Sequence, residues 1–170
     1  MKYQHNYKWL SKIKVLFPDT KSNYSALENA ETFNTLSLDK HVTFTGRVRE
    51  FSEQPDVTGL FLEHYPGMTE NVLNNIAEQA KLRWPLDGIR IIHRVGELFA
   101  KDQIVLVGVS SAHRIAAYEA SQYIMDILKT EAPFWKKETT KTEQGEAGER
   151  WVDAKTSDSK QAADWTQTIK

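Results

Sequence analysis

Residues 41–49 read HVTFTGRVR, and apolar and polar side chains alternate along this stretch. Valine, phenylalanine or glycine occupies every second position from Val42 to Val48, with threonine or arginine at the positions between them. Alternation with a period of two residues is typical of a strand that buries one face. The stretch therefore predicts a β-strand that begins at His41.

A second strand and a helix are expected after this first strand. GLFLEHY, at residues 59–65, is rich in apolar and aromatic residues and predicts the strand. Thr69 is the expected N-cap of the helix, and Met68 before it can pack onto Leu73. Apolar residues then recur at helical spacing until Pro85, which ends the helix.

The middle of the chain predicts a hairpin and a long helix. IRIIHRVGEL, at residues 89–98, and QIVLVGVSS, at residues 103–111, are the two expected strands, and the short FAKD connection between them suits an antiparallel hairpin. A helix is expected from about Ala112 to Thr130, because apolar residues line one of its faces and Pro133 prevents its continuation.

These elements favour an α+β fold rather than a doubly wound sheet. We expect an antiparallel sheet with packed helices, and a small β-rich C-terminal portion to which WVDAK, at residues 151–155, contributes a short strand. Residues 1–40 are expected to be a poorly defined N-terminal extension, residues 41–156 the main α+β domain, and residues 157–170 a C-terminal tail.

The composition excludes several classes of function. The chain has 22 Lys and Arg against 23 Asp and Glu, so no global field attracts nucleic acid or an acidic membrane, and any anion site must be local. No apolar run reaches the roughly 18 residues that cross a bilayer, and the first residues lack the features of a signal peptide, so the cytoplasm is the expected location. Cysteine is missing, which excludes thiolate metal sites and cysteine nucleophiles.

Two basic clusters are candidate anion sites. Arg47 and Arg49 lie two positions apart on the first predicted strand, so both side chains point the same way and can converge on one anion. His113 and Arg114 fall at the start of the predicted long helix, where cations oppose the helix dipole but where phosphate binds well. In both cases the alternative is an ordinary solvated surface.

A third basic cluster consists of Lys129, Lys136 and Lys137. A lysine near the C-terminal end of a helix suits the helix dipole, so a structural role for Lys129 stays open. Phe134 and Trp135, beside the other two lysines, are equally compatible with plain core packing. The five histidines show no metal-ligand spacing, and there is no glycine-rich phosphate loop, so neither a metal site nor nucleotide activation is predicted.

Several longer strings are more specific than spacing alone. In chain order they are FTGRVR at 44–49, LEHYPGM at 62–68, RWPL at 83–86, IIHRVGEL at 91–98, SSAHR at 110–114, IMDILKT at 124–130 and APFWKKE at 132–138. Over about residues 41–151, the sequence resembles the large, catalytic subunit of molybdopterin synthase. Residues 1–40 depart from that family's pattern, because Asp39-Lys40-His41 stands where a glycine-led apolar segment is expected.

The resemblance implies a hammerhead-like α/β core and a sulfurtransferase without a bound cofactor or metal. Such an enzyme is a homodimer in which each subunit binds a small ubiquitin-like sulfur carrier, so the assembly is a heterotetramer. The carrier ends in a Gly-Gly thiocarboxylate, and two of its sulfurs convert cyclic pyranopterin monophosphate into the dithiolene of molybdopterin. A synthase supplied in this way needs no cysteine of its own.

By the same resemblance, nine residues match functional positions of the family. The catalytic lysines fall on Lys129 and Lys136. The substrate-binding positions fall on Arg47, Val48, Arg49, His113, Arg114, Lys137 and Glu138.

Two other interpretations stay open from the residues alone. One is a non-catalytic module that binds anionic ligands, and the other is a scaffold that docks a ubiquitin-like partner. Within the enzyme interpretation, His113 and Lys129 lie sixteen residues apart on one predicted helix. Because this spacing corresponds to roughly 24 Å along the axis, we expect each active site to draw residues from two subunits.

Overall fold

A computed structural model describes residues 13–16, 40–48, 57–141, 147–152 and 161–165 of the chain. Its strands form two sheets of four strands each. Sheet A contains, in spatial order, β1 (Ile13–Leu16), β4 (Gly88–His93), β6 (Gln103–Ser110) and β2 (His41–Arg47). Sheet B contains β5 (Gly96–Leu98), β3 (Val57–His64), β7 (Phe134–Lys141) and β8 (Ala147–Val152).

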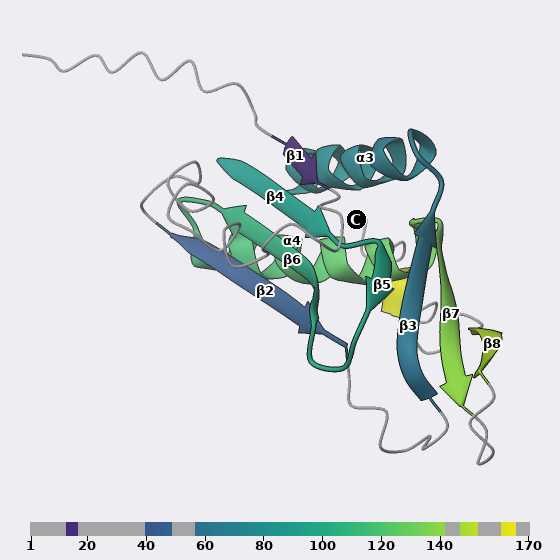
Figure 1. Cartoon of the computed structure of the whole chain (residues 1–170). Coiled ribbons are helices and arrows are strands. Elements are labelled where there is room, and N and C mark those ends of the chain that lie inside the picture. The colour runs from purple at the N-terminus through teal and green to yellow at the C-terminus, as the bar shows by residue number, and fades with distance from the viewer. Residues whose placement is uncertain (1–12, 17–39, 49–56, 142–146, 153–160, 166–170) are drawn as a thin grey trace, which may run out of the picture.

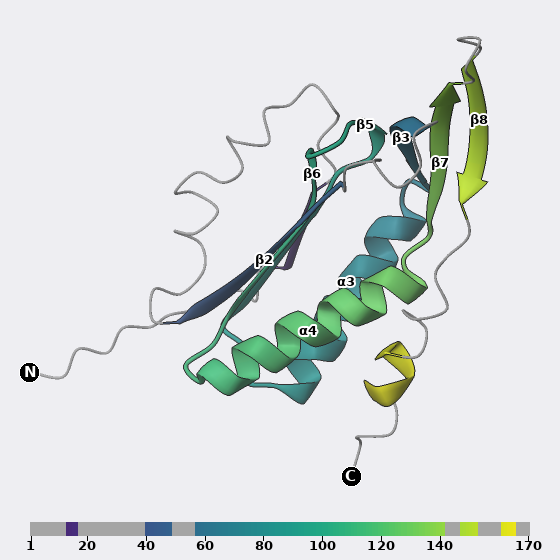
Figure 2. The same ribbon diagram turned by 90° about the horizontal axis from the view of Figure 1, so that it is seen from below.

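Two helices, α3 (Met68–Arg83) and α4 (Arg114–Glu131), cover one face of sheet A (Figure 1, Figure 2). The core lies between the helices and the sheet. Ile89 and Ile91 of β4 alternate with residues that point to the opposite face, and they meet Leu73 of α3 and Ile124 of α4 in one buried cluster. This packing of helices on a sheet confirms the predicted α+β class.

The pairing of sheet A confirms the predicted antiparallel pairing of β4 and β6, but not a hairpin closed by FAKD, and it adds one strand. β4 and β6 are antiparallel, as are β2 and β6, with His41 opposite Ser110 and Arg47 opposite Gln103. β1 pairs with β4 in parallel, and the sequence did not predict this strand. At least these four residues of the N-terminal forty therefore belong to the sheet.

The stretch IRIIHRVGEL does not form the single strand that its composition predicts. β4 ends at His93, and β5 begins at Gly96 and pairs with β3 in sheet B. Gly96 has a φ of 83°, a left-handed conformation that favours glycine, and the Arg94 N–H donates to the Ile104 carbonyl at 2.8 Å. The chain therefore leaves sheet A and enters sheet B at this corner. A continuous apolar stretch in the sequence cannot show that its two halves belong to different sheets.

The two helices begin at residues other than those predicted. The N-cap of α3 is Gly67, whose N–H donates to the Glu70 carboxylate at 2.5 Å. Thr69, the predicted cap, is buried inside the first turn, where its hydroxyl accepts from the Tyr65 N–H at 3.1 Å. Met68 starts the helix and is half exposed, instead of preceding it. In α4 the N-cap is His113, so Arg114 is the first helical residue.

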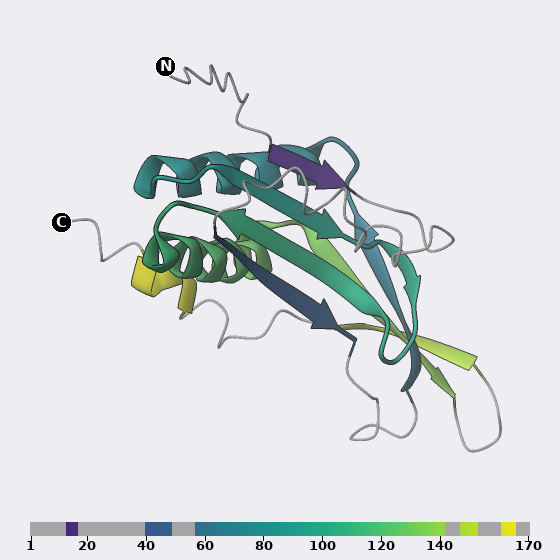
Figure 3. The ribbon, with the colours of Figure 1, turned by 90° about the vertical axis from the view of Figure 1, so that its left-hand side faces the viewer.

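The C-terminal part of the described chain has two pieces. β8 covers residues 147–152, so it contains only the first two residues of the WVDAK stretch predicted as a strand, and residues 153–155 lie outside the described part. Residues 161–165 form a short helical segment beside α4 (Figure 3). Trp165 packs edge-on against Trp84 and Tyr123, and its indole N–H donates to Asp126 at 2.9 Å. None of the described helices combines the length and apolar character of a membrane span.

The close approach of β2 to β6 predicts that Gly46→Ala destabilises the fold. A Cβ at Gly46 would lie 2.7 Å from Cγ1 of Val105, so the buried Val105 side chain has to move. We expect a loss of about 1–3 kcal/mol in the free energy of unfolding, measured by urea denaturation. Gly59→Ala is the matched control, because its Cβ would meet its nearest neighbours at an ordinary 3.7 Å. Equal stability of the two variants would contradict the prediction.

Candidate active site

The topology of sheet A separates the candidate residues into two groups. Three residues, 111–113, separate the end of β6 at Ser110 from the start of α4, which packs back along β6 and β2. The end of the sheet at His41 and Ser110 therefore lies near the start of α4, and the end at Arg47 and Gln103 lies near its last turn. His113 and Arg114, at the start of α4, lie at the first end, whereas Lys129, in its last turn, lies at the second.

An exposed basic group, here called the N-terminal cluster, consists of Lys40, His113 and Arg114 at the start of α4. The first turn of α4 contains no acidic residue, and the His113 side chain makes no capping hydrogen bond. The Ser111 hydroxyl fixes the turn before the helix, since it donates to the Pro85 carbonyl at 2.8 Å and accepts from the His113 N–H at 3.1 Å. The positive end of the helix dipole therefore adds to these cations, which suits a phosphate.

Lys40 is a member of this cluster that sequence reasoning missed. Its ammonium donates to the Ala112 carbonyl at 2.9 Å, and its own carbonyl accepts from the Ser111 N–H at 3.1 Å. The two segments are 72 residues apart, and only the pairing of β2 with β6 brings them together. No spacing signal in the sequence could have shown this contact.

The second group, here called the lysine pair, consists of Lys129 and Lys136 on the two sides of the turn from α4 to β7. Lys129 lies in the last turn of α4, and Lys136 is the third residue of β7. The turn between them is short, because the Phe134 N–H donates to the Ala132 carbonyl at 2.8 Å. Both lysine side chains are exposed.

Lys136 and Lys137 point to opposite faces of sheet B. Lys136 lies opposite the buried Leu62, on the face turned toward the small core that Leu62 forms with Val48 and Leu98. Lys137 lies opposite Phe61 and Trp151 on the other face. Adjacent lysines on one strand therefore cannot act as a single cluster, as their neighbourhood in the sequence had suggested.

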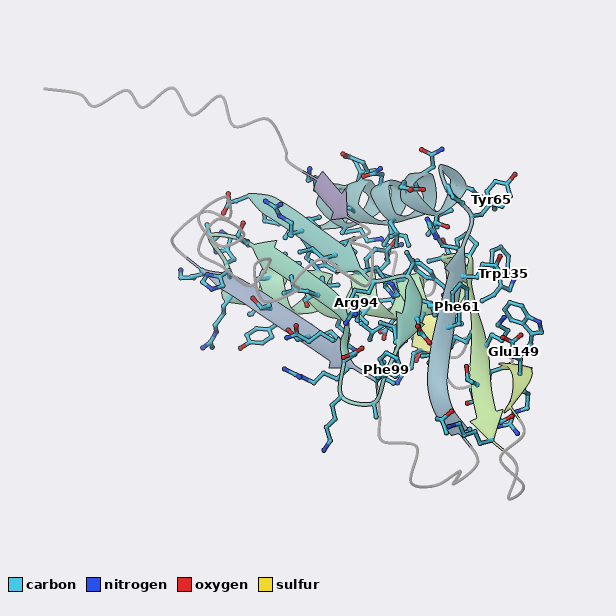
Figure 4. All side chains as sticks on the ribbon, viewed as in Figure 1. Phe61, Tyr65, Arg94, Phe99, Trp135 and Glu149 are labelled. Carbon is cyan, nitrogen blue, oxygen red and sulfur yellow. The ribbon has the colours of Figure 1, made fainter. Side chains whose placement is uncertain are left out.

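The face that carries Lys137 is aromatic and acidic. The Lys137 ammonium lies 5.3 Å from the centre of the Phe61 ring and 5.6 Å from that of Trp151, and it forms an ion pair with Glu149 at 2.8 Å. Trp135 projects on the same side of β7 (Figure 4). Through these contacts the Lys137 side chain connects β7 to β8.

Glu138 also has a cross-strand partner. Its carboxylate accepts from Nη2 of Arg150 at 2.5 Å and from Nε of the same side chain at 3.2 Å. Glu138 lies on the same face of β7 as Lys136 and two residues further along the strand. It therefore lies beside the lysine pair, but its charge is already balanced by Arg150.

The expected substrate-binding strand segment ends at the edge of the described part. The Arg47 guanidinium donates to the Lys101 carbonyl at 3.2 Å, at the end of β2 away from the N-terminal cluster. Val48 is buried, and its N–H donates to the Asp102 carbonyl at 2.8 Å. Arg49 lies outside the described residues. Within one chain, Arg47 lies about 20 Å from the start of β2 and so does not meet His113.

His93, at the end of β4, is a buried titratable group. Its ring stacks on Phe134 with 4.0 Å between the centroids, and Nδ1 lies 2.9 Å from the Arg94 carbonyl. Because a carbonyl only accepts, Nδ1 carries the ring proton. The pKa of His93 is lowered to about 4, mainly by burial and in smaller part by the electrostatic effects of Lys136 and His64, while the backbone hydrogen bond to Arg94 opposes this shift. The imidazole is therefore neutral near pH 7.

The described residues contain no group of three or more His, Asp or Glu that could hold a metal ion. What they present is an α+β domain with exposed cations at the two ends of one helix. The model of the MoaE protein family matches residues 22–131, and the chain belongs to this family.

Relatives in this family carry the name of a catalytic subunit. The chain is 54% identical to the molybdopterin synthase catalytic subunit of Escherichia coli K12 over 124 residues, which cover 73% of this chain and 79% of the relative. The corresponding subunit of Vibrio cholerae is 56% identical over the same number of residues, with the same coverage of both chains. These likenesses confirm the family that the sequence strings suggested.

Solved structures show the same fold. The molybdopterin cofactor biosynthesis protein E of Burkholderia multivorans superposes with a TM-score of 0.66 at 39% identity, covering 92% of this chain and 97% of that chain. The molybdopterin synthase structure from Staphylococcus aureus superposes with a TM-score of 0.67 at 29% identity, covering 82% of this chain and 96% of that chain.

The buried neutral state of His93 predicts a loss of stability in acid. The pKa of His93 is about 4 in the fold, against an ordinary 6.5, so the unfolded chain takes up this proton first as the pH falls. The stabilising contribution is therefore complete above pH 6.5 and is lost progressively toward pH 4. Between pH 7 and pH 5, the free energy of unfolding should fall by about 2 kcal/mol more in the wild type than in His93→Phe.

His93→Phe is the appropriate comparison because phenylalanine retains a ring against Phe134 but does not titrate. Urea denaturation at the two pH values measures the difference, and the titration of all other groups is common to both proteins. Parallel loss of stability in the wild type and in His93→Phe would show that His93 titrates normally.

Proposed function

We propose that this chain is the catalytic subunit of a molybdopterin synthase, which moves two sulfurs from a thiocarboxylated ubiquitin-like carrier to cyclic pyranopterin monophosphate in the cytoplasm. The observation that carries the proposal is the identity of 54–56% over 124 residues to relatives named as such subunits. The exposed lysine pair and the N-terminal cluster supply cations for a reaction whose two substrates are both anionic. The missing cysteine is consistent with sulfur that arrives on a carrier.

The lysine pair is suited to the transfer step. A thiocarboxylate sulfur that attacks a side-chain carbon of the cyclic pterin becomes bonded to both the pterin and the acyl carbon of the carrier. The carbon–oxygen bond at the attacked carbon breaks, and its oxygen leaves with the phosphate, which opens the ring, or as water. Water then cleaves the acyl–sulfur bond, leaving sulfur on the pterin and a carboxylate on the carrier. We assign Lys129 to the carrier terminus, where its charge stabilises the oxyanion of this hydrolysis. We assign Lys136 to proton transfer or charge stabilisation at the reacting pterin carbons.

The carrier is the proposed protein partner. A solved complex from Helicobacter pylori, described as subunits 1 and 2 of the molybdopterin-converting factor, shares the fold with a TM-score of 0.59 at 18% identity over 74% of this chain and 83% of that chain. We infer that this chain also binds a small subunit, and that the Gly-Gly thiocarboxylate tail reaches the lysine pair. The turn from α4 to β7 leaves both lysines exposed to an incoming tail.

The N-terminal cluster is suited to the phosphate of the pterin. His113 and Arg114 are exposed at a helix N-terminus that has no acidic residue in its first turn. At a helix N-terminus, backbone N–H groups and nearby cations form an anion-binding site that suits a phosphate. The other proposed substrate-binding residues are Arg47, Val48, Arg49, Lys137 and Glu138.

We infer that each active site is shared between two copies of the chain. α4 is an unbroken helix from Arg114 to Glu131, so His113 and Lys129 of one chain are held roughly 24 Å apart, too far for both to touch one pterin phosphate. A two-fold dimer can bring the N-terminal cluster of one chain to the lysine pair of the other. Ile115 and Tyr118 follow the cluster on α4 and are mostly exposed, which suits a surface that a second copy covers.

The function is tested by turnover of the cyclic pterin with thiocarboxylated carrier, followed by mass spectrometry of the product. Lys129→Ala and Lys136→Ala should each lower the rate of dithiolene formation by about 10²–10³, because each removes a preorganised charge. Lys141→Ala, at the other end of β7, is the control and should keep the wild-type rate. A folded variant of either lysine of the pair with near-normal turnover would refute its assignment.

The shared site is tested by mixing two inactive proteins. His113→Ala/Arg114→Ala protein and Lys129→Ala protein are combined under conditions in which subunits exchange. In a mixed dimer one site gathers every defect and the other is wild type. Because random mixing makes about half of the dimers mixed, about a quarter of the wild-type activity should return. Verified exchange without any activity would show that each site lies within one chain.

A further inference from the structure

His93 occupies the corner at which the chain leaves sheet A for sheet B. It is the last residue of β4, and it is only 5% exposed. The next residue fixes the corner, because the Arg94 N–H donates to the Ile104 carbonyl at 2.8 Å and its guanidinium donates to the Gln103 carbonyl at 3.1 Å. The His93 ring therefore projects from a backbone that is held in place on both sides.

The ring of His93 meets the first residue of β7. Its plane lies within 16° of the Phe134 ring plane, with 4.0 Å between the centroids. Phe134 and Lys136 lie two residues apart on this strand and therefore on the same face. Along the chain, nothing but the short turn through Pro133 connects Phe134 to α4. The stack is thus a contact between the two sheets, at the place where the strand that bears Lys136 begins.

The charge state of His93 suits this position. Nδ1 donates its proton to the Arg94 carbonyl, so the ring is held in one orientation. Its titratable neighbours include Lys136 on β7 and His64 at the end of β3, and both disfavour a positive charge on the ring. A neutral ring provides a flat packing surface beside Lys136 without repelling its ammonium.

We propose that His93 is a positioning residue for Lys136, because its ring holds Phe134 against the end of β4 and thereby sets where the Lys136 side chain projects. The proposal rests on the proposed function of Lys136. His93 itself touches neither substrate, and its effect passes through Phe134 and two residues of β7. Displacing a reacting group by about 1 Å can cost on the order of 10²-fold in rate, so a small shift of this strand is enough to matter.

The first test compares variants at His93 in the full chain with its carrier. His93→Ala removes the stack and should lower kcat by about tenfold or more, while KM for the cyclic pterin stays the same. His93→Phe keeps a ring and should restore most of kcat. Leu73→Ala, a buried change in α3, controls for lost stability and should leave kcat unchanged below its unfolding temperature. Equal kcat loss in His93→Phe and His93→Ala, or in Leu73→Ala, would overturn the proposal.

A double-mutant cycle tests the path through Phe134. Phe134→Leu should lower kcat by a factor similar to that of His93→Ala, and the double variant should be no slower than either single one, because both remove the same contact. Multiplied losses in the double variant would show that the two residues act separately. If His93→Ala fails to fold, the cycle is run with His93→Leu.

A further measurement separates this proposal from the proposed function. The rate at which an N-hydroxysuccinimide ester acylates Lys136 at fixed pH, followed by peptide mass spectrometry, reports its surroundings without any turnover. His93→Ala should change this rate, and neither His93→Phe nor Leu73→Ala should do so. Unchanged acylation of Lys136 in His93→Ala would overturn the positioning role. A wild-type chain without synthase activity would instead overturn the proposed function and leave the acylation result standing.

Discussion

The apolar face of α4 packs along sheet A from the end at His41 to the end at Arg47, and the position of every candidate residue depends on this packing. The helix is unbroken over Arg114–Glu131, so its two ends are fixed near opposite ends of the strands that it covers. The turn before it is held by Ser111, and the turn after it leads directly into β7. A rigid element of this kind separates two groups of cations and prevents them from meeting within one chain.

Much of the fold could be predicted because it follows from local periodicity. The alternation of residues 41–49 gave β2, and the apolar stripe with Pro133 gave α4 within two residues at each end. The split of IRIIHRVGEL into β4 and β5 could not be predicted in this way, since both halves are apolar and only their partners differ. The cap of α3 was missed for a similar reason. Thr69 has the chemistry of a cap, but the backbone of Gly67, with φ at 83°, starts the helix.

The sequence proposes residues for the candidate site but does not predict their arrangement. The strings around Lys129 and Lys136 identified the family, but adjacency in sequence made Lys136 and Lys137 look like one cluster. Because side chains alternate along a strand, Lys136 and Lys137 lie on opposite faces of β7. The Lys137 ammonium forms an ion pair with Glu149 and lies over two aromatic rings. By contrast, pairing of strands that are far apart in the sequence brings Lys40 to the start of α4, where its ammonium donates to the Ala112 carbonyl. A contact between residues that are far apart in the sequence cannot be predicted from the spacing of residues along the chain.

The separation of the cations also has an electrostatic consequence. The two ends of α4 are about 24 Å apart, which exceeds the Debye length of about 8 Å at physiological ionic strength, so within one chain the clusters scarcely repel each other. A shared site would bring His113 and Arg114 of one copy close to Lys129 and Lys136 of another. That approach costs free energy in the empty dimer, and a phosphate with a thiocarboxylate offsets the cost by neutralising the added charge. Each bound anion lowers the positive potential of the shared site, so binding of these anions would favour the assembled dimer over separated chains.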